Sequence, residues 1–351
     1  MPDDTDRPAE PTETDRAILV AREHDRFALR AATARGELRR VRRGAYRSVL
    51  GSPGPTAPGA AAPAPTPSRD RALERVGAVH RQLDAVHVFS HTTSALLWGI
   101  PLWRAPTTTH VLQRYRAGGT AASDITRHRP LPERWVELAG LPVTDLPRTV
   151  VDCLTTLHPL DGLVVADWAL GHGVDPTELL RRLDARASRR GDARARHVLD
   201  LADGGATTPW ETWLRYVALR AGLPRPTTQL PVPVECTTYF VDLAWREHRV
   251  LVEFDGRVKY TDGAFGAGYD ADRARFDEKV REDAITEVMG VRPARFTARG
   301  ARDTAAVTRR VLRLFPESVR SAARPDPRLG PPEHDADERA GREIGGSGRG
   351  R

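Results

Sequence analysis

The sequence of 351 residues contains almost no lysine and no asparagine. Only two of its 54 Lys and Arg residues are lysines, Lys259 and Lys279. A lysine ammonium is compact and can lose its proton, whereas a guanidinium stays charged. The two lysines are therefore candidates for a role that arginine does not fill, and both lie in one short stretch of the C-terminal half.

Cysteine and long apolar runs are also scarce. Two cysteines, Cys153 and Cys236, are too few for a disulfide framework and lack the spacing of metal ligands, which fits a reducing compartment. No apolar run approaches the roughly 18 residues of a membrane span. The acidic start MPDDTDRPAEPTETD is unlike a signal peptide. We therefore expect a cytoplasmic protein without a membrane partner.

The overall composition is that of a soluble globular protein, with 40% hydrophobic and 29% charged residues. The chain is long enough for two or three domains, each with its own core. The formal net charge of +7 favours a polyanionic partner, and DNA is the partner that we expect.

Composition separates ordered from disordered segments. Residues 1–14 and 322–351 are polar and are expected to be disordered, and residues 51–68 form a Pro/Ala/Gly linker. The remaining segments predict an α+β and α/β multidomain protein with three parts: a winged-helix-like module over 15–50, a mixed α/β middle domain over 69–205 and a nuclease-like domain over 206–316.

The N-terminal module is small and basic. Residues 17–21 and 27–31 predict two short helices, and GELRRVRRGAYRSVL predicts a hairpin that turns at Arg43-Gly44. Two helices followed by a basic hairpin are the layout of a winged helix, whose wing contacts phosphates. The candidate nucleic-acid contacts are Arg39, Arg40, Arg42 and Arg43. A solvated basic surface is the alternative interpretation.

The middle segment mixes the hydrophobic periodicity of helices with that of strands. VHVFS and THVL predict short strands, and the predicted helices are RDRALERVGAVHRQL, SHTTSALLWGI, DLPRTVVDCLTTL, LDGLVVADWAL and DPTELLRRLDA. Ser90 is expected to cap its helix, and His91 is assigned to the start of that helix. A structural role is expected for His128, Asp152 and Asp167.

The C-terminal segment has the clearest order of elements. TTPWETWLRYVALRAGLP predicts a helix with Thr208 as N-cap and Glu211 three residues later, the spacing of a capping box. QLPVPVE, YFVDLAW and RVLVEFDG predict strands, ADRARFDEKVREDAITEVMG an amphipathic helix, RPARFTA a strand and ARDTAAVTRRVLRLF a closing helix. The predicted order is α-β-β-β-α-β-α. The apolar side of the amphipathic helix comprises Phe276, Val280, Ala284 and Val288.

The hairpin between YFVDLAW and RVLVEFDG carries two acidic residues. With Glu247-His248 as a two-residue turn, Asp242 lies directly opposite Glu253, at a Cβ separation of about 4.5–5.5 Å. Opposed carboxylates destabilise a sheet unless a cation neutralises them, and Mg²⁺ binds few protein carboxylates while keeping sites for water and phosphate oxygens.

Two further residues complete this predicted site. Asp255 follows Glu253 on the same face of the strand, and Lys259 lies one short turn later. A metal that activates water, together with a lysine that orients it, suits phosphodiester hydrolysis. The sequence thus predicts a Mg²⁺ (or Mn²⁺) site with Asp242 and Glu253 as ligands.

The strings TPWETW, VDLAW, VLVEFDGRVKY and EKVRED resemble the nuclease-like domains related to very-short-patch-repair endonucleases, within the PD-(D/E)XK superfamily. The resemblance covers residues 206–316. It implies Asp242 and Glu253 as metal ligands and Glu211 as the acid of the first helix. The superfamily places its lysine two residues after the second acid, where this chain has Asp255, so Lys259 or Lys279 would take that role.

The N-terminal strings LRRVRRGAYR, SHTTSALLWGIPL, LPVTDLPRTVVDCL and VVADWAL resemble actinobacterial proteins with an AbiEi-type antitoxin domain. That resemblance implies a DNA-binding regulator of a type IV toxin–antitoxin system, with a toxin protein as a possible partner.

Structural interpretations stand beside the catalytic ones. Asp242 and Glu253 could form a solvated hairpin face, and Glu211 could serve only the capping box. Glu278 with Glu282, and Lys279 with Asp283, have the i,i+4 spacing of a charged helix face, with a role at the active site as the alternative. Two other functions remain open for the whole chain: an inactive antitoxin-type regulator and a protein-interaction module.

Overall fold

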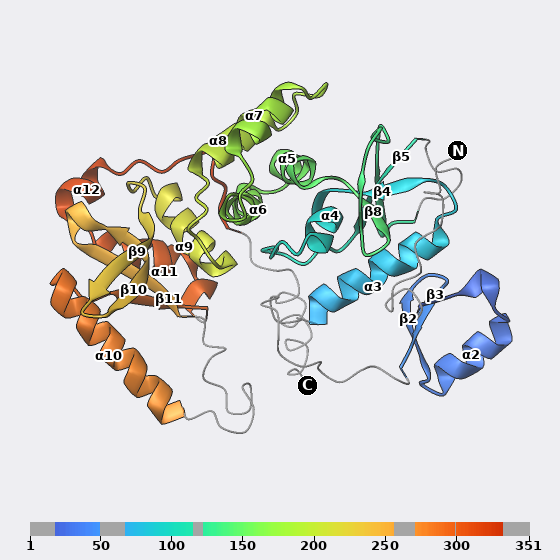
Figure 1. Ribbon diagram of the computed structural model, residues 1–351, viewed down its shortest axis with the longest axis horizontal. Coiled ribbons are helices and arrows are strands. Elements are labelled where there is room, and N and C mark those ends of the chain that lie inside the picture. Colours follow the sequence, from blue (N-terminus) through green and yellow to red (C-terminus); the bar gives the residue numbers. More distant parts are fainter. Residues whose placement is uncertain (1–17, 50–66, 115–121, 256–270, 299, 333–351) are drawn as a thin grey trace, which may run out of the picture. The chain divides into compact units, whose positions relative to one another are not determined.

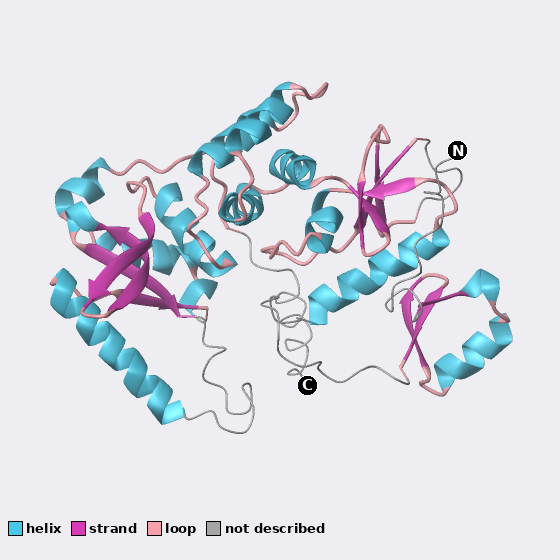
Figure 2. Ribbon diagram, viewed as in Figure 1, coloured by secondary structure: helices cyan, strands magenta, loops and turns pink. Residues whose placement is uncertain are grey.

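The structure, a computed structural model, describes residues 18–49, 67–114, 122–255, 271–298 and 300–332 (Figures 1 and 2). The chain divides into two compact units. The first unit comprises Met1–Cys153 with Thr177–Ala187, and the second comprises Leu154–Pro176 with Ser188–Arg351. Both units combine helices with a sheet, so the expected mixed α/β multidomain class is confirmed.

The N-terminal part of the first unit is a three-stranded antiparallel sheet in the order β1-β3-β2. Its elements are β1 (Ile18–Val20), η1 (Ala21–Glu23), α2 (Arg26–Ala34), β2 (Leu38–Arg42) and β3 (Ala45–Ser48). The expected second helix and the hairpin turn at Arg43-Gly44 are both present. Gly44 has a φ of 74°, a conformation that glycine adopts without steric cost.

The prediction of a helix over residues 17–21 is wrong, because residues 18–20 form strand β1 and, of this range, only Ala21 belongs to the short η1 helix. Ile18 and Val20 are both buried and β-branched, with Leu19 less buried between them. That alternation fits a strand packed on one face, and β1 pairs with β3 along its whole length.

A five-stranded sheet follows in the order β6-β5-β4-β8-β7. Its strands are β4 (His87–Phe89), β5 (Thr109–Gln113), β6 (Ile125–His128), β7 (Val136–Leu138) and β8 (Leu141–Val143). Helix α3 (Pro67–Gln82) contacts both sheets of the first unit. Ala78 joins the core of the small sheet, and Val76 and Val79 join the core of the large one. The N-terminal module and the following sheet thus share one helix.

One helix lies between β4 and β5, and the next four helices of the described chain follow β8. They are α4 (His91–Leu97), α5 (Leu146–Thr156), α6 (Pro159–Gly171), α7 (Pro176–Asp184) and α8 (Asp192–Leu201). All but α8 correspond to predicted helices, whereas β6, β7 and β8 are short strands that the sequence does not indicate. Among the described residues, none of the helices combines the length and apolarity needed to cross a membrane.

Residues 206–316 contain the expected sequence of elements. In chain order these are α9 (Pro209–Arg220), β9 (Thr227–Val234), β10 (Thr237–Trp245), β11 (Val250–Asp255), α10 (Ala271–Met289), β12 (Ala294–Thr297) and α11 (Thr304–Arg313). The sheet has the order β12-β11-β10-β9, with β12 parallel to β11 and the other pairs antiparallel. Helix α9 is buried over Glu211–Leu219 and contacts β10, β11, α6 and α11.

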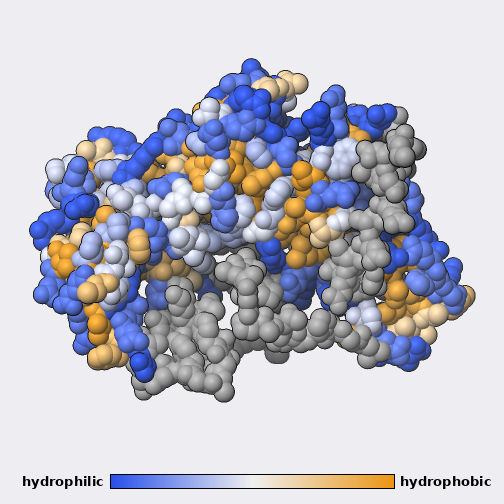
Figure 3. Space-filling view, viewed as in Figure 1, coloured by the Kyte–Doolittle hydropathy of each residue, from blue (hydrophilic) through white to orange (hydrophobic). Residues whose placement is uncertain are grey.

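Helix α10 buries a different face from the expected one. Phe276, Val280 and Val288 are exposed, and Figure 3 shows hydrophobic surface over α10. Ile285 instead enters the core of the sheet, and Glu282 is also buried. The hydrophobic stripe misleads because ion pairs satisfy the acidic residues on the packed face, which allows their burial.

The chain beyond α11 is partly ordered. Helix α12 spans Glu317–Ala322, and residues up to 332 are described, in contrast to the disorder expected from residue 322. Leu329 is buried, and the Tyr216 hydroxyl donates a 2.7 Å hydrogen bond to the carbonyl of Gly330. These contacts attach the segment to α9. The segments expected to be disordered over 1–14, and most of the linker over 51–68, lie outside the described residues.

A buried ion pair joins α6 to α9 in the second unit. The Arg215 guanidinium donates to both Asp167 oxygens at 2.6 Å, and the two side chains are 3% and 1% exposed. Thr212 also donates to Asp167, at 2.7 Å. Asp167 therefore has the structural role that we expected.

We predict that Arg215→Ala lowers the free energy of unfolding by about 3–5 kcal/mol, because it leaves the Asp167 carboxylate buried without its counter-charge. Urea denaturation followed by tryptophan fluorescence measures the loss. The matched control is Arg225→Ala, which breaks an ion pair with Asp200 that is 56% and 67% exposed. We expect that control to cost less than about 1 kcal/mol, and equal losses in the two variants would contradict the prediction.

Candidate functional site

The register of the β10–β11 hairpin places the two acidic residues as expected. The strands pair as Leu243↔Val252, Ala244↔Leu251 and Trp245↔Val250. One further step in the same register brings Asp242 opposite Glu253. The connection differs from the expected two-residue turn, because η2 (Arg246–His248) is followed by Arg249 with a φ of 53°. A connection of even length preserves the register, so the opposition of the acids survives.

Asp242 lies where the backbone pairing of β10 and β11 ends. Its carboxylate accepts a 2.8 Å hydrogen bond from the backbone N–H of Phe254, which occupies the neighbouring strand. On the other side, Gln229 of β9 donates to Asp242 at 3.2 Å. Gln229 has a φ of 45°, and the pairing of β9 with β10 skips this position. Local departures from the regular sheet therefore direct two donors at one carboxylate.

Glu211 connects helix α9 to this carboxylate. The Glu211 backbone N–H donates to the Thr208 hydroxyl, and the Glu211 side chain accepts from Thr207 and Thr208 at 2.9 Å, so the predicted cap is present. Gln229 also donates to Glu211, at 3.1 Å, through the same nitrogen that contacts Asp242. Glu211 is thus both a cap of α9 and a neighbour of Asp242.

Glu253 is neutralised by an arginine from α10. Arg281 donates to the two Glu253 oxygens at 2.6 and 3.2 Å, and Glu253 is only 6% exposed. Arg281 also bonds the Phe240 carbonyl at 2.7 Å, and it reaches Glu278 at 3.2 Å. Nothing in the sequence distinguishes Arg281 from the other arginines, so this contact was not predicted.

The electrostatics of the acidic cluster, defined as Glu211, Asp242 and Glu253, are unfavourable. The pKa of Asp242 is raised to about 6, first by burial of the carboxyl and then by the negative charge of Glu211 and, to a smaller extent, of Glu253. Hydrogen bonds from Phe254 and Gln229 act in the opposite direction. No ion pair joins Glu211 or Asp242 to a basic side chain in the described part of the chain. The cluster therefore holds uncompensated negative charge.

The remaining predicted residues lie around this cluster. Asp255 ends β11 and pairs with Thr297, so it shares the strand face of Glu253. Lys259 lies outside the described residues. Lys279 is exposed, and no hydrogen bond or ion pair joins it to another side chain of the described ranges. Glu278 and Glu282 form ion pairs with Arg295, and Glu282, which is buried, also pairs with Arg292.

The four arginines predicted to contact phosphates differ in solvent exposure and in their ion pairs. Arg42 is 7% exposed and donates to both oxygens of Asp124 at 2.8 Å, so it is an internal ion pair of the first unit. Arg39 pairs with buried Glu74 but remains 46% exposed. Arg40 and Arg43 are exposed. The accessible positive charge of the hairpin is therefore smaller than its arginine content indicates.

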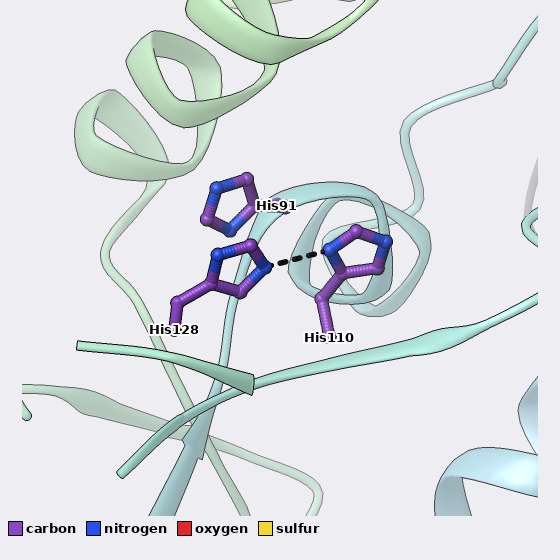
Figure 4. A group of neighbouring side chains, drawn as sticks. All are labelled: His91, His110 and His128. Atoms are coloured by element: carbon purple, nitrogen blue, oxygen red, sulfur yellow. Dashed lines mark hydrogen bonds between the residues drawn. The ribbon is translucent and has the colours of Figure 1, made fainter. Parts of the chain in front are cut away.

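A second cluster, which the sequence did not predict, lies in the first unit. His91, His110 and His128 each offer a ligand atom within 4.8 Å of the others (Figure 4). Burial lowers the pKa of His91 to about 2 and that of His110 to about 4, and neighbouring histidines contribute to both shifts. Burial also lowers the pKa of His128, so all three rings are favoured in the neutral form, which is the form that binds metals.

The two clusters suit different ions. Glu211 and Asp242 offer carboxylate oxygens to an ion such as Mg²⁺, and their uncompensated charge fits a divalent cation. Glu253 could bind such an ion only after Arg281 releases it, because Arg281 binds both of its carboxylate oxygens. In the described part of the chain, the histidine triad is the group in which three or more such side chains hold ligand atoms within 4.8 Å of one another. The described oxygens of Glu211, Asp242 and Glu253 do not all lie within this distance of one another.

Comparisons with known proteins add little to this description. No protein family model matches the chain, and no curated protein matches it. Among solved structures, the RV2827C protein from Mycobacterium tuberculosis is similar to this chain at 18% sequence identity and a TM-score of 0.34. The match covers 52% of this chain and 71% of that protein.

We predict that Asp242→Asn raises the free energy of unfolding at pH 8 by about 2–3 kcal/mol. Because the pKa of Asp242 is raised to about 6 in the folded chain, the folded state binds the proton more tightly than the unfolded state. The wild type therefore loses stability as pH rises from about 4 to about 6, and the variant does not. Urea denaturation at pH 8 and pH 4 measures the difference, which disappears at the lower pH.

The control is Asp283→Asn, which changes an exposed carboxylate on α10. We expect it to alter stability by less than about 0.5 kcal/mol at either pH. A stabilisation by Asp242→Asn that is the same at both pH values would show that charge is not its cause.

Proposed function

We propose that the second unit is a Mg²⁺- or Mn²⁺-dependent phosphodiesterase of the PD-(D/E)XK type that acts on DNA. The observation that carries this proposal is the convergence of three carboxylates: Gln229 bonds both Glu211 and Asp242, and Asp242 lies opposite Glu253. Burial and the two neighbouring carboxylates raise the pKa of Asp242. Proteins seldom bury like charges together without a counter-charge, and perturbed carboxylates gather at functional sites. The α-β-β-β-α-β-α order and the opposition of Asp242 and Glu253 support the same assignment.

Asp242 and Glu253 would hold the ion, with Glu211 as the acid contributed by the first helix. The ion would activate a water and offset the charge that develops on the phosphate oxygens. The residues of the chain position the carboxylates: Phe254 and Gln229 fix Asp242, and the cap at Thr208 fixes Glu211. Lys259, or Lys279 after a rearrangement, would orient the attacking water, with Asp255 nearby.

DNA binding by the first unit would complement this activity. The N-terminal hairpin presents Arg40 and Arg43 at the surface, and Arg39 keeps part of its guanidinium exposed. Such side chains neutralise backbone phosphates without reading the sequence. The winged-helix-like interpretation of this module belongs to the same proposal.

A second candidate function is an antitoxin-type DNA-binding regulator whose nuclease-like unit is inactive. The observation that favours it is the bidentate Arg281–Glu253 pair, which places a guanidinium on one of the two proposed metal ligands. The replacement of the expected lysine position by Asp255 points in the same direction.

We predict that the full-length protein nicks supercoiled plasmid DNA in the presence of Mg²⁺ or Mn²⁺, as measured by gel electrophoresis. Asp242→Ala and Glu253→Ala are each expected to reduce nicking by at least about 100-fold. Loss of a residue that only supports a metal ligand typically costs about 10–100-fold in activity, and loss of a ligand itself should cost more. Asp283→Ala, which removes an exposed acid of α10, is the control and should retain wild-type activity.

Arg281→Gln separates the two candidates. Stronger nicking by this variant than by the wild type would support the enzyme and show that Arg281 competes with the ion. The absence of nicking in both proteins with every divalent ion, together with tight binding to one promoter sequence, would establish the regulator instead.

We also predict that the double variant Arg40→Ala/Arg43→Ala weakens DNA binding at low salt. The slope of log K against log salt concentration should become shallower by about 1.8, since each lost phosphate contact contributes about 0.9. Fluorescence anisotropy over a salt series measures the slope. Arg42→Ala, which breaks the internal pair with Asp124, should leave the slope unchanged. A change of slope in that variant alone would contradict the assignment.

A further inference from the structure

Three elements of the first unit bring His91, His110 and His128 together (Figure 4). His91 begins α4, and the other two lie on adjacent parallel strands, His110 on β5 and His128 at the end of β6. Leu112 of β5 pairs with His128 of β6. His110 lies two residues before Leu112, so its side chain is on the same face of the sheet as that of His128. The Nδ1 atom of His110 is 2.9 Å from Nε2 of His128.

Hydroxyl groups hold the outer nitrogen of two of these rings. Ser90 Oγ is 3.0 Å from Nδ1 of His91, and Thr108 Oγ1 is 3.3 Å from Nε2 of His110. These contacts leave Nδ1 of His110 for its contact with His128 and leave Nε2 of His91 as the nitrogen that could bind an ion. Metal-bound histidines characteristically use their second nitrogen in this way, which fixes the tautomer and the ring orientation.

The backbone around the cluster is fixed by further hydrogen bonds. The His110 N–H donates to Thr93 Oγ1 at 2.8 Å, and the His110 carbonyl accepts from the Ser90 N–H at 3.1 Å. His91 is buried and has a φ of 52°, in the left-handed region that non-glycine residues rarely occupy. Such backbone strain persists where the surroundings enforce it, and it gathers at functional sites.

We propose that His91, His110 and His128 bind one divalent first-row transition metal ion of the Zn²⁺ class. Three neutral imidazoles favour zinc, cobalt, nickel or copper, whereas Mg²⁺ and Ca²⁺ require oxygen ligands. Three protein ligands leave at least one coordination position for water or another small ligand, the pattern of an open site.

The spacing of the rings is compatible with one shared ion. Two nitrogens at about 2.1 Å from a metal lie roughly 3.0 Å apart at a right angle and roughly 3.4 Å apart at the tetrahedral angle. The observed 2.9 Å between His110 and His128 is close to the first value. The rings of His91 and His128 are stacked, with centroids 3.8 Å apart and an angle of 15° between their planes. Binding therefore requires the rings to rotate until their nitrogens converge on the ion, and it replaces the hydrogen bond between His110 and His128.

Charged groups border the cluster. Asp152 lies 4.0 Å from Nδ1 of His91 and is paired with Arg148 at 2.8 Å. Arg148 and Arg186 contribute positive charge to the surroundings of His91. The two arginines oppose a bound cation and Asp152 favours it, so affinity would come from the nitrogen ligands themselves. The proposal is independent of the proposed nuclease, since all these residues lie in the first unit and the acidic cluster lies in the second.

The test uses the untagged full-length protein, stripped with a chelator and titrated with Co²⁺ and Zn²⁺. We expect one equivalent of Co²⁺ to bind with visible d–d absorption and to be displaced by Zn²⁺. His110→Ala and His128→Ala should each weaken binding by at least about 100-fold. The matched control is His80→Ala, because His80 and His87 form a pair at 3.0 Å outside this group. That control should bind like the wild type.

Thermal unfolding gives a second readout, because an ion that binds only the folded chain raises the unfolding temperature. Zn²⁺ should stabilise the wild type and His80→Ala, and should not stabilise His110→Gln, a variant that keeps a polar side chain if alanine disrupts folding. The proposal is overturned if the wild type takes up no ion at one equivalent, or if His128→Ala binds as tightly as the wild type. The rings would then be a hydrogen-bonded cluster of the core.

Discussion

The burial of like charges at one end of the C-terminal sheet is the constraint on which the candidate active site depends. Glu211, Asp242 and Glu253 come from a helix and two strands, and hydrogen bonds fix the positions of Glu211 and Asp242 without removing their charge. Repulsion between carboxylates in a poorly solvated site destabilises the folded chain until a proton or a cation offsets it. Any divalent ion that enters would therefore stabilise the fold as it binds, so metal affinity and stability are linked.

Arg281 makes this site asymmetric. It compensates Glu253 and leaves Asp242 and Glu211 without an ion pair in the described part of the chain, so one of the three carboxylates is neutralised and two are not. Its Nη1 atom contacts Glu253 and Glu278 at the same distance of 3.2 Å. An acceptor for Arg281 is therefore already in contact with it, and movement away from Glu253 would not leave the guanidinium unpaired. Occupation of Glu253 by Arg281 is thus compatible with both an enzyme and a regulator.

Sequence patterns predict the features that depend on neighbours along the chain. The cap of α9 follows from Thr208 and Glu211, and the opposition of Asp242 and Glu253 follows from strand alternation and an even-length connection. The buried face of α10 is predicted wrongly, because ion pairs with distant arginines allow Glu282 to be buried. Ile18 and Val20 resemble the start of a helix until pairing with β3 makes them a strand. The histidine triad depends on the pairing of β5 with β6, which no local pattern specifies.

The chemical difference between the two clusters separates the ions that they would bind. An oxygen site with uncompensated negative charge attracts hard cations, and it also attracts Zn²⁺ when no better ligand is near. Three imidazoles provide that better ligand, because nitrogen donors bind late first-row metals more strongly than carboxylates do and bind Mg²⁺ poorly. The triad has a lowered pKa at His91 and His110, so protons do not compete with a metal there at neutral pH, whereas Asp242 still competes with a proton near pH 6. Under the two proposals, a transition metal ion would therefore bind in one unit and leave the other unit free for Mg²⁺.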